Sequence, residues 1–412
     1  MRILFISNFY PPYHRGGYEE WCHEIAQRFL SAGHEVRVLT STFQPENAKD
    51  DPKNVFRQLN LEMEMSSLSN GLKFFTHRTQ RLKESLAHVS QHIADFRPDA
   101  VLVWGMWNLP FDIPVMAEQL LPGRVMYYLG DYWPTLPPQF KNYWEAKPGN
   151  WLTAIPKTLL AIPAKIMLKR ESRPKLALEH GLFCSQYLQD ELAANGVNFK
   201  NSQIVYGAID TQPYQELVSD RDELDDRPTQ LLSISRLIPD KGVETIISAL
   251  AQLKHEHQLR NLHLKIIGSG LPVYEAKLRQ LVADNQLENE VTFVGTVPKN
   301  KIPGLYQAAD IFLFASIWPE PFGRVIVEAM ASDLVVVGTA VGGAAEILES
   351  GSNALTFTPD DASDLANHLK RLIEKPELKA QLTAQAKQDA LEKFDLTRMF
   401  QQIEAQLASI ID

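Results

Sequence analysis

The chain has 412 residues, more than one hydrophobic core usually organises, so two domains are the first expectation. A net charge of -9 argues against a general nucleic-acid binder, because a polyanion would be repelled. The two cysteines, Cys22 and Cys184, are too few for a disulfide framework or a cysteine-rich zinc site, and they suit a reducing cytosol.

The sequence also indicates where the protein works. Its first residues lack the long apolar stretch of a signal peptide, and no run reaches the ~20 apolar residues of a membrane span. We therefore expect a cytoplasmic protein, with peripheral contact at the inner face of the plasma membrane left open.

Apolar runs alternate with helical stretches in the first half of the chain. A short apolar run at 3–7 predicts a buried strand, 18–32 has the apolar spacing of a helix that Gly33 would end, and 35–40 predicts a second strand. Further strand-like runs lie at 100–104, 124–129, 181–184 and 203–205. Strands that alternate with helices predict a parallel sheet with helices on both faces.

The alternation stops at an acidic segment and then restarts. Residues 219–228 have hardly any apolar side chain and predict an interdomain linker, followed by helices at 243–255 and 272–285. Strands are expected at 230–235, 263–268, 291–294, 311–315, 335–338 and 354–357. The sequence therefore predicts an α/β fold of two Rossmann-like, doubly wound domains, 1–218 and 229–393, that face a central cleft. In such folds ligands bind beyond the carboxyl ends of the strands.

A pair of cations follows the first strand of the second domain. Arg236 and Lys241 lie five residues apart around a turn that Pro239 and Gly242 favour. A guanidinium and an ammonium so placed can hold one pyrophosphate, and the helix that begins next adds its positive end. The alternative, equally open from this motif alone, is a charged turn with two solvated cations.

Two glutamates, Glu320 and Glu328, are candidates for binding vicinal hydroxyls. Pro321 and Gly323 put Glu320 in a loop after a strand, and Glu328 lies on the helix that follows, among apolar neighbours. A buried carboxylate needs a partner, and the diols of a ribose or a hexose can donate paired hydrogen bonds to it. The alternative is a structural Glu328 paired with an arginine or a backbone group.

Glycine pairs follow three predicted strands. Gly268 and Gly270 would let the backbone approach a ligand closely, although such a pair is often only a tight turn. The pair at 342–343 predicts either a wall of the same pocket or a plain turn. Gly16 and Gly17 open the first predicted helix, where backbone amides can receive an anion or a sugar ring.

Other ligand motifs are absent or misplaced. The loop before the first helix is not a Gly-x-Gly-x-x-Gly fingerprint, and 40–42 are hydroxyl residues where a nicotinamide site wants an acid. There is no Walker loop and no His-Glu-x-x-His, and Asp220-Arg221-Asp222 lies in the acidic segment, which we interpret as solvated charge. The sequence predicts no metal and no other cofactor.

Together these motifs resemble those of the retaining GT-B-fold glycosyltransferases of family 4, the glycosyl transferases group 1, over almost the whole chain. The specific part is Ser-Arg…Lys-Gly at 235–242 combined with Glu-x7-Glu at 320–328. Such enzymes move a sugar from a nucleoside-diphosphate sugar to an acceptor hydroxyl, usually without a metal because two cations do that work. Their final helix often crosses back to the first domain, which would be 394–412 here.

The resemblance assigns roles to the charged side chains. Arg236 and Lys241 would neutralise the donor diphosphate in the second, donor-binding domain. Glu320 would hold hydroxyls of the transferred sugar, and Glu328 would hold those of the ribose.

Backbone groups complete the predicted donor site. Phe322 and Gly323 would offer amides near the sugar, and the loop near Val297 should read the base. The remaining donor-binding candidates are Gly16, Gly17, Gly268 and Gly270.

The chain departs from the family pattern in the first domain. Many members have a His-Asp pair after a strand near the reacting carbon, but here the strand at 124–129 runs into Gly130-Asp131, so only the aspartate matches. The resemblance makes Asp131 a catalytic residue that orients or activates the acceptor hydroxyl. The alternative is an aspartate that caps a helix start.

Residues 151–175 are typical of a membrane-surface element. Apolar residues recur at helical spacing from 152 to 166, basic residues are interleaved and follow them, and aromatic residues come before. The alternative is a helix that packs its apolar stripe on the first domain, and Pro156 and Pro163 argue against one continuous helix.

The leading hypothesis is a sugar transferase with a saccharide or lipid-linked acceptor, in surface polysaccharide or glycolipid synthesis. Two alternatives stay open: a GT-B sugar-nucleotide epimerase, which needs no acceptor, and a catalytically silent nucleotide-sugar-binding subunit, which the missing histidine favours.

Overall fold

The structure is a computed structural model that describes residues 1–13, 16–44, 51–64, 70–147, 151–215, 227–255 and 261–411, without the side chains of 151–154 and 156. The chain packs into two compact units. Unit 1 comprises Met1–Cys184, Leu188–Val205 and Phe400–Asp412, and unit 2 comprises Ser185–Tyr187 and Tyr206–Met399. Of the predicted linker at 219–228, residues 219–226 lie outside the described part.

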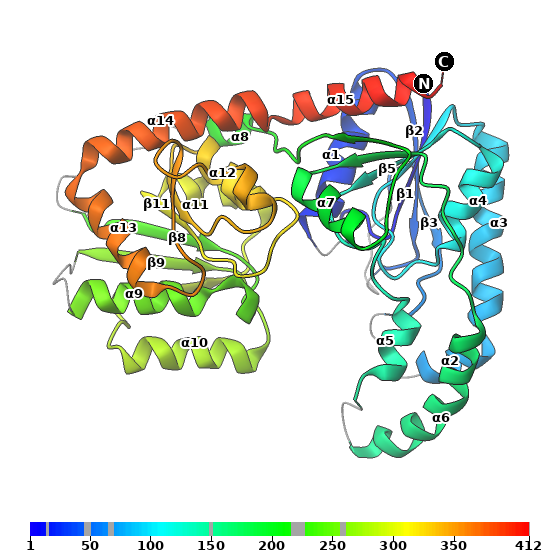
Figure 1. Cartoon of the computed structure of the whole chain (residues 1–412), viewed down its shortest axis with the longest axis horizontal. Coiled ribbons are helices and arrows are strands. Elements are labelled where there is room, and N and C mark those ends of the chain that lie inside the picture. Colours follow the sequence, from blue (N-terminus) through cyan, green and yellow to red (C-terminus); the bar gives the residue numbers. More distant parts are fainter. Residues whose placement is uncertain are drawn as a thin grey trace. The chain divides into compact units, whose positions relative to one another are not determined.

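Unit 1 is built on a seven-stranded parallel sheet in the order β3-β2-β1-β4-β5-β6-β7 (Figure 1). Its central strand is apolar along most of its length, and Ile3 and Phe5 are fully buried between β2 and β4. The strands are β1 (Arg2–Ser7), β2 (Glu35–Ser41), β3 (Val55–Leu59), β4 (Ala100–Val103), β5 (Val125–Leu129), β6 (His180–Phe183) and β7 (Asn201–Ile204).

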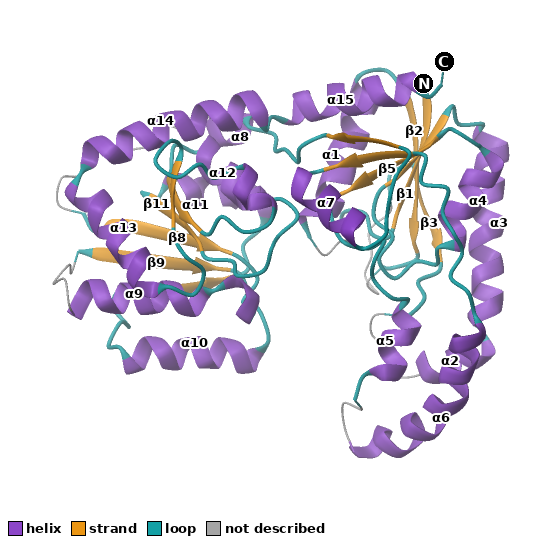
Figure 2. Cartoon of the chain, viewed as in Figure 1, coloured by secondary structure: helices purple, strands orange, loops and turns teal. Residues whose placement is uncertain are grey.

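Helices pack against this sheet, with α1 against β1 and β2 and α3 against β3 (Figure 2). The C-terminal residues join them, because Phe400 packs on Phe29 with ring centroids 4.9 Å apart and Glu404 lies 2.6 Å from His34. The helices are α1 (Gly17–Ser31), α2 (Asn70–Thr76), α3 (Arg78–Phe96), α4 (Asp112–Leu120), α5 (Gln139–Glu145), α6 (Trp151–Arg170), α7 (Gln186–Ala194) and α15 (Leu396–Ser409). The first residues of α7 and of α15 belong to unit 2.

Unit 2 is built on a six-stranded parallel sheet in the order β10-β9-β8-β11-β12-β13. The strands are β8 (Thr229–Ile234), β9 (Leu262–Ile267), β10 (Val291–Gly295), β11 (Ile311–Phe314), β12 (Val335–Gly338) and β13 (Ala354–Thr356). The helices are α8 (Gln212–Gln215), α9 (Val243–His255), α10 (Pro272–Asp284), α11 (Ile302–Gln307), α12 (Arg324–Ala331), α13 (Ala362–Glu374) and α14 (Pro376–Lys393), with short 3-10 turns η2 (Pro239–Lys241), η3 (Lys299–Lys301) and η4 (Gly343–Glu346).

Each sheet contains one point where the winding reverses. Successive strands run outward from β1 through β2 to β3, and the chain then returns to place β4 on the other side of β1; β8 and β11 have the same relation in unit 2. Open α/β sheets bind ligands beyond the carboxyl ends of the strands at such a point. The loops after β8 and β11 carry Arg236 and Glu320, and the loop after β1 leads to Gly16 and Gly17.

The predicted architecture of two Rossmann-like, doubly wound α/β units is confirmed, with two local differences. The sequence analysis misses β3, because only its end residues Val55 and Leu59 are buried and it lacks a continuous apolar run. The doubt about α6 was wrong: it is one helix in spite of Pro156 and Pro163, each of which removes a single backbone donor without ending the helix here. No helix in the described part is long and apolar enough to cross a membrane.

Asp310 ties the start of β8 to the start of β11, at the edge of the sheet opposite these loops. Its side chain accepts two hydrogen bonds from the Arg227 guanidinium and one from the Gln230 amide, each 2.8 Å long. Burial alone would raise the pKa of Asp310, but these hydrogen bonds outweigh it and hold the pKa below its usual value. The carboxylate is therefore ionised and stabilises unit 2.

Asp310→Ala should lower the free energy of unfolding of unit 2 by about 3 kcal/mol at neutral pH, because it leaves the Arg227 guanidinium without its partner. Because the pKa of Asp310 is lower in the folded than in the unfolded chain, its ionised form stabilises the fold at pH values above the unfolded-state pKa. This stabilisation is lost as the pH falls through the folded-state pKa. Urea unfolding should therefore show a wild-type advantage that shrinks in acid. An equal loss for the exposed control Asp284→Ala would contradict this account.

Candidate functional site

The loop after β8 is fixed by backbone hydrogen bonds to the loop after β9. Leu237 N donates to Ser269 O at 2.9 Å, and Leu237 also forms a bridge with Gly270. Arg236, which precedes Leu237, is exposed, and its guanidinium has no hydrogen bond or ion pair within the described residues. Its backbone is thus held while its side chain is available to a ligand.

Gly268 and Gly270 allow these two loops to lie against each other. A Cβ at Gly268 would be 1.8 Å from Ser235 O, and a Cβ at Gly270 would be 1.8 Å from Leu237 O. Any side chain would therefore push the loops apart. The sequence analysis expected these glycines to admit a ligand; the close approach in the structure is between two backbone segments that frame Arg236.

Lys241 and Glu320, which the sequence analysis places in one site, are in contact. Lys241 Nζ lies 2.6 Å from Glu320 Oε1, and both side chains are mostly buried. The turn η2 that carries Lys241 is fixed to the loop after β11, because Asp240 O accepts from Ile317 N at 2.9 Å. Gly242, at φ 61°, permits this approach, since a Cβ there would be 2.0 Å from Ala315 O.

The loop around Glu320 is held from its other side by the glycine pair at 342–343. Gly343 N donates to Glu320 O at 2.7 Å, and Glu320 forms a bridge with Gly342. A Cβ at Gly343 would be 2.1 Å from Pro321 O, so this position needs a glycine. The glycine pair therefore supports the loop that carries Glu320, and its part in the wall of a pocket stays a prediction.

Phe322 and Gly323 lie at the start of α12. The Phe322 ring is buried and packs on Phe394, with centroids 5.6 Å apart, so only its backbone is suited to a ligand. Gly323 is the residue before the helix and has φ 138°, a conformation that side chains disfavour. Both positions are compatible with the predicted amide donors.

Glu328, on α12, is buried and has two partners. Glu328 Oε1 accepts from Arg324 Nε at 3.1 Å, and Glu328 Oε2 accepts from Tyr306 Oη at 3.0 Å. Lys299 lies near this group: burial and the Arg324 charge lower the pKa of Lys299 to about 8, partly opposed by Glu328. The arginine partner that the sequence analysis kept as an alternative is therefore present.

Three of these neighbours escaped the sequence analysis. Arg324 has a readable signal, because it lies four residues before Glu328 on one helix face. Tyr306 and Lys299 come from other elements, 22 and 29 residues away by their numbers, and no local pattern marks them.

Val297 lies in the loop after β10, beside the loop that follows β9. Gly268 N donates to Gly295 O at 2.9 Å, and the hydroxyls of Ser269 and Thr296 are 3.0 Å apart. Val297 is half-buried in that loop. Its role in reading a base stays a prediction.

In unit 1, Gly16 and Gly17 stand at the start of α1 as predicted. Gly16 has an extended backbone, and Gly17 is the first helical residue. Two residues of the preceding predicted loop, 14 and 15, lie outside the described part. The next residue, Tyr18, explains the missing histidine.

The Tyr18 ring occupies the space that a side chain at position 130 would need. A Cβ at Gly130 would lie 2.5 Å from Tyr18 Cδ2 and Cε2. The Tyr18 hydroxyl is within hydrogen-bond distance of Trp104 O and Tyr128 O, so the ring is anchored. A histidine at position 130 is therefore sterically excluded unless Tyr18 moves.

Asp131 follows Gly130 and caps a turn rather than a helix. Its Oδ1 accepts from Trp133 N at 3.1 Å, and no helix begins there, so the helix-cap alternative was wrong. Burial raises the pKa of Asp131 to about 7, with a further rise from the Glu19 charge and an opposing effect of the Trp133 hydrogen bond. A carboxyl with this pKa can gain or lose a proton near neutral pH.

The raised pKa makes Asp131 a cost to stability when it is ionised. The Asp131 carboxyl keeps its proton up to about pH 7 in the folded chain, whereas in the unfolded chain it loses the proton near its ordinary pKa. The free energy of unfolding therefore falls as the pH rises from the unfolded-state pKa to the folded-state pKa. Asp131→Asn keeps the oxygen that Trp133 needs and should raise the unfolding free energy by about 1 kcal/mol or more at pH 8, but not at pH 4. Thermal unfolding across pH measures this; a variant that is less stable at high pH would contradict it.

The family comparison concerns mainly unit 2. Residues 215–389 match the family model described as Glycosyl transferases group 1. Over 177 residues the chain is 31% identical to mannosylfructose-phosphate synthase from Agrobacterium fabrum, an alignment that covers 42% of this chain and 39% of that protein. The chain thus spans well under two thirds of the length of this relative.

Solved structures extend the similarity to both units. The chain is similar to a glycosyltransferase from Rickettsia africae ESF-5, with 19% identity, a TM-score of 0.74 and coverage of 100% of this chain and 98% of that one. It is also similar to HepE from Anabaena in complex with UDP and glucose, with 24% identity, a TM-score of 0.69 and 99% coverage of each chain. At these identities the likeness shows the fold, which is the GT-B fold.

Proposed function

We propose that this chain belongs to the group 1 glycosyltransferase superfamily, whose family model matches residues 215–389, and that it moves a sugar from a nucleoside-diphosphate sugar to an acceptor hydroxyl. The contact between Lys241 and Glu320, 2.6 Å apart, carries the proposal. A donor's sugar and diphosphate are joined by the bond that breaks. A cation for the phosphate and a carboxylate for the sugar must therefore be neighbours.

The proposed reaction creates negative charge on the leaving group. The bond between the anomeric carbon and the phosphate oxygen breaks, the acceptor oxygen bonds to that carbon, and the acceptor proton passes to the leaving diphosphate. Arg236 and Lys241 stabilise the diphosphate, and Glu320 binds sugar hydroxyls. Asp131 orients the acceptor hydroxyl.

Glu328 can bind the ribose without giving up its present partners. Each of its carboxylate oxygens accepts one hydrogen bond, from Arg324 and from Tyr306, and each has a further acceptor position. The two partners fix the carboxylate in one orientation, which lowers the entropic cost of binding the ribose.

The identity of the donor class has separate support. HepE, which shares the fold, has been solved with UDP and with UDP-glucose. We extend the proposal to retention of the anomeric configuration and to family 4, on the motif order of Arg236, Lys241, Glu320 and Glu328. Work in surface polysaccharide or glycolipid synthesis belongs to the same proposal.

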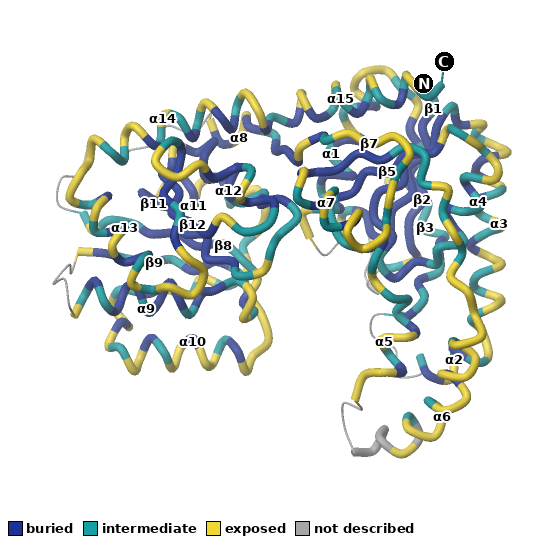
Figure 3. The backbone as a smooth tube through the Cα atoms, viewed as in Figure 1, coloured by how far each residue is buried: buried dark blue, intermediate teal, exposed yellow. Residues whose placement is uncertain are grey.

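We also propose that α6 contacts a membrane surface. Its apolar residues do not all pack on unit 1: Ile155, Leu159 and Ile162 are 72%, 64% and 62% exposed. Figure 3 shows exposed residues along much of the described part of α6. The helix is anchored instead through Ala164, which is fully buried. Its last turn carries Lys169 and Arg170, which complements an anionic lipid surface.

Nucleotide binding tests the donor site. In a thermal-shift panel with UDP, GDP and ADP, one nucleotide at ~100 times its dissociation constant should stabilise the protein by about 2.7 kcal/mol. Arg236→Ala/Lys241→Ala should weaken that binding about 100-fold or more, because two charge-assisted contacts are lost.

The control for nucleotide binding is Arg371→Ala/Lys375→Ala, which removes the same charge from exposed positions of unit 2. It should bind the nucleotide like the wild type. Equal losses in both double variants, or no binding by the well-folded wild type, would contradict the assigned donor site. A change in the donor sugar without any acceptor would indicate an epimerase instead.

Vesicle binding tests the role of α6. The chain should co-sediment with vesicles that contain phosphatidylglycerol and not with phosphatidylcholine alone. Leu159→Ser/Ile162→Ser should weaken binding about tenfold or more, because two apolar side chains no longer enter the lipid. Leu271→Ser/Val273→Ser removes equally exposed apolar residues from unit 2 and should have no effect. If both pairs behave alike, α6 is not the contact.

A further inference from the structure

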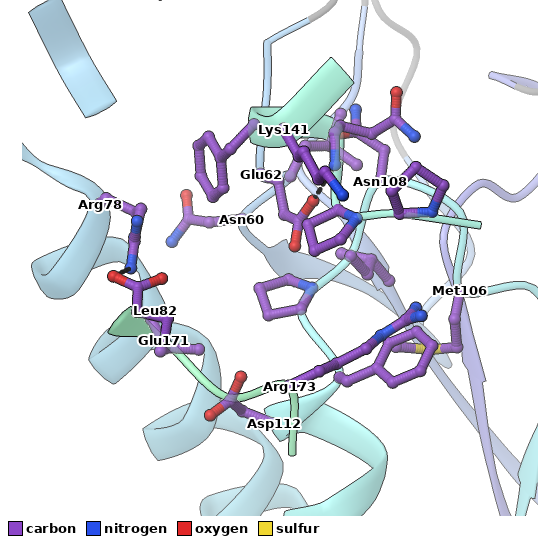
Figure 4. Close-up of a pocket in the computed structure, with 18 of the residues that line it drawn as sticks. Asn60, Glu62, Arg78, Leu82, Met106, Asn108, Asp112, Lys141, Glu171 and Arg173 are labelled. Atoms are coloured by element: carbon purple, nitrogen blue, oxygen red, sulfur yellow. Dashed lines mark hydrogen bonds and ion pairs between the residues drawn. The ribbon is translucent and has the colours of Figure 1, made fainter. Parts of the chain in front are cut away.

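A cavity of about 550 Å³ lies wholly within unit 1, and none of the residues assigned to the donor lines it (Figure 4). It is lined by the segments that follow β3, β4 and β5, and by the C-terminal end of α6. Its size is that of a small-molecule site, and its position beyond the carboxyl ends of the strands is where such sheets bind ligands.

Aromatic rings form much of the cavity wall. Lining rings come from Phe74, Trp107, Phe111, Trp133 and Phe140. They are held by contacts among themselves, such as the edge-to-face pair of Phe111 and Trp133 at 5.2 Å. Arg78 lies over Phe74 and Phe140, and Arg173 lies over Phe111, so each of these rings has at most one open face. An open apolar ring face suits the C–H face of a sugar ring, which is apolar although its rim is polar.

Most cations of the cavity are already neutralised by neighbouring carboxylates. Glu64 is 2.5 Å from Lys73 and 3.0 Å from Arg81, and Glu171 pairs with Arg78 (Figure 4). These internal pairs leave little net charge for a ligand to complement.

Charges of both signs remain. Arg173 stacks on Phe111, 3.3 Å from its centroid, and Lys141 is exposed with only a distant partner at 4.0 Å. The cavity lining also contains the carboxyl groups of Glu62 and Asp112. Burial raises the pKa of Glu62 to about 7, opposed by the Gln139 hydrogen bond, so this carboxyl is partly protonated near neutral pH. An anionic ligand would meet carboxylates as well as cations.

Unused hydrogen-bonding groups of both kinds line the same cavity. Among the described residues, Trp133 Nε1 and Arg78 Nη1 are buried without a partner. Asp112 accepts no hydrogen bond in the described part, and Glu62 uses one oxygen, which accepts from Gln139 N at 2.6 Å. Orphaned buried donors are costly unless a ligand completes them. Hydroxyl groups, which donate and accept, can serve both kinds.

We infer that this cavity binds the acceptor, and that the acceptor is a neutral saccharide rather than an acyl chain, a sugar phosphate or a uronic acid. The inference rests on the proposed function and adds the substrate class. Trp133 connects the cavity to the proposed catalytic Asp131, because the Trp133 ring lines the cavity while its backbone N–H donates a hydrogen bond to Asp131 at 3.1 Å. Leu168 of α6 also lines the cavity, so a saccharide on a membrane lipid would reach it from the proposed lipid-facing helix.

The test measures saccharide binding to the full chain by saturation-transfer NMR, with nucleotide thermal shift as a separate readout. The panel contains methyl glucoside, methyl galactoside and maltose, then glucuronate and glucose 6-phosphate, then farnesyl phosphate. We expect at least one neutral sugar to bind. Trp133→Phe, which removes the unpaired N–H together with part of the ring, and Asp112→Asn should each weaken that binding about three- to tenfold. The exposed Asp95→Asn is the matched control and should bind like the wild type.

The outcomes separate this inference from the donor assignment. The inference is overturned if no neutral sugar binds, if only the anionic or lipid probes bind, or if both variants bind as well as the wild type. In each of these cases, a nucleotide thermal shift that is still present leaves the proposed function standing. Trp133→Phe also removes part of a buried ring and should lower the melting temperature of the ligand-free protein, so its sugar binding is measured well below that temperature. If that variant does not fold, the panel and Asp112→Asn still decide.

Discussion

The contact between Lys241 and Glu320 is the interaction on which the candidate donor site depends. It joins the loops that leave β8 and β11, on either side of the point where the winding of the sheet reverses. Both loops are fixed by backbone approaches that admit no Cβ, at Gly242 beside Ala315 O and at Gly343 beside Pro321 O. The ion pair is therefore preorganised by the backbone, which is the arrangement that stabilises developing charge most effectively.

Unit 1 meets a different constraint at the position where the family pattern has a histidine. The Tyr18 ring fills that space and forces a glycine at position 130, and the burial around it raises the pKa of Asp131 to about 7. The chain thus keeps a group that titrates near neutral pH at this point, with a carboxyl in place of an imidazole. On the proposed function, loss of the histidine changes how the acceptor is held rather than whether the chain can act.

Much of the fold was predictable because most strands carry their own signal. Strands such as β1 and β12 are apolar on both faces, so each is recognisable as an apolar run in the sequence. Once the strands are located, the helical stretches between them give the α/β alternation. The edge strand β3 has no such run, so it was missed. The exposed apolar face of α6 was also beyond the sequence, because periodicity shows that a stripe exists and not what covers it.

The candidate site was predictable only in part, for a physical reason. Lys241 and Glu320 are 79 residues apart, and only the resemblance to known motifs joined them. Tyr306 and Lys299 gather around Glu328 through packing that no local spacing records. The cavity in unit 1 is assembled from four segments, and none of them has a motif of its own.

The most direct measurement of the central claim is a crystal structure of the chain with a nucleoside diphosphate that the thermal-shift panel identifies. The account predicts phosphate oxygens within hydrogen-bond reach, about 3 Å, of Lys241 Nζ and the Arg236 guanidinium, with the ribose at Glu328. A diphosphate bound at any other place, with the pair of Lys241 and Glu320 undisturbed and solvent around Arg236, would contradict it.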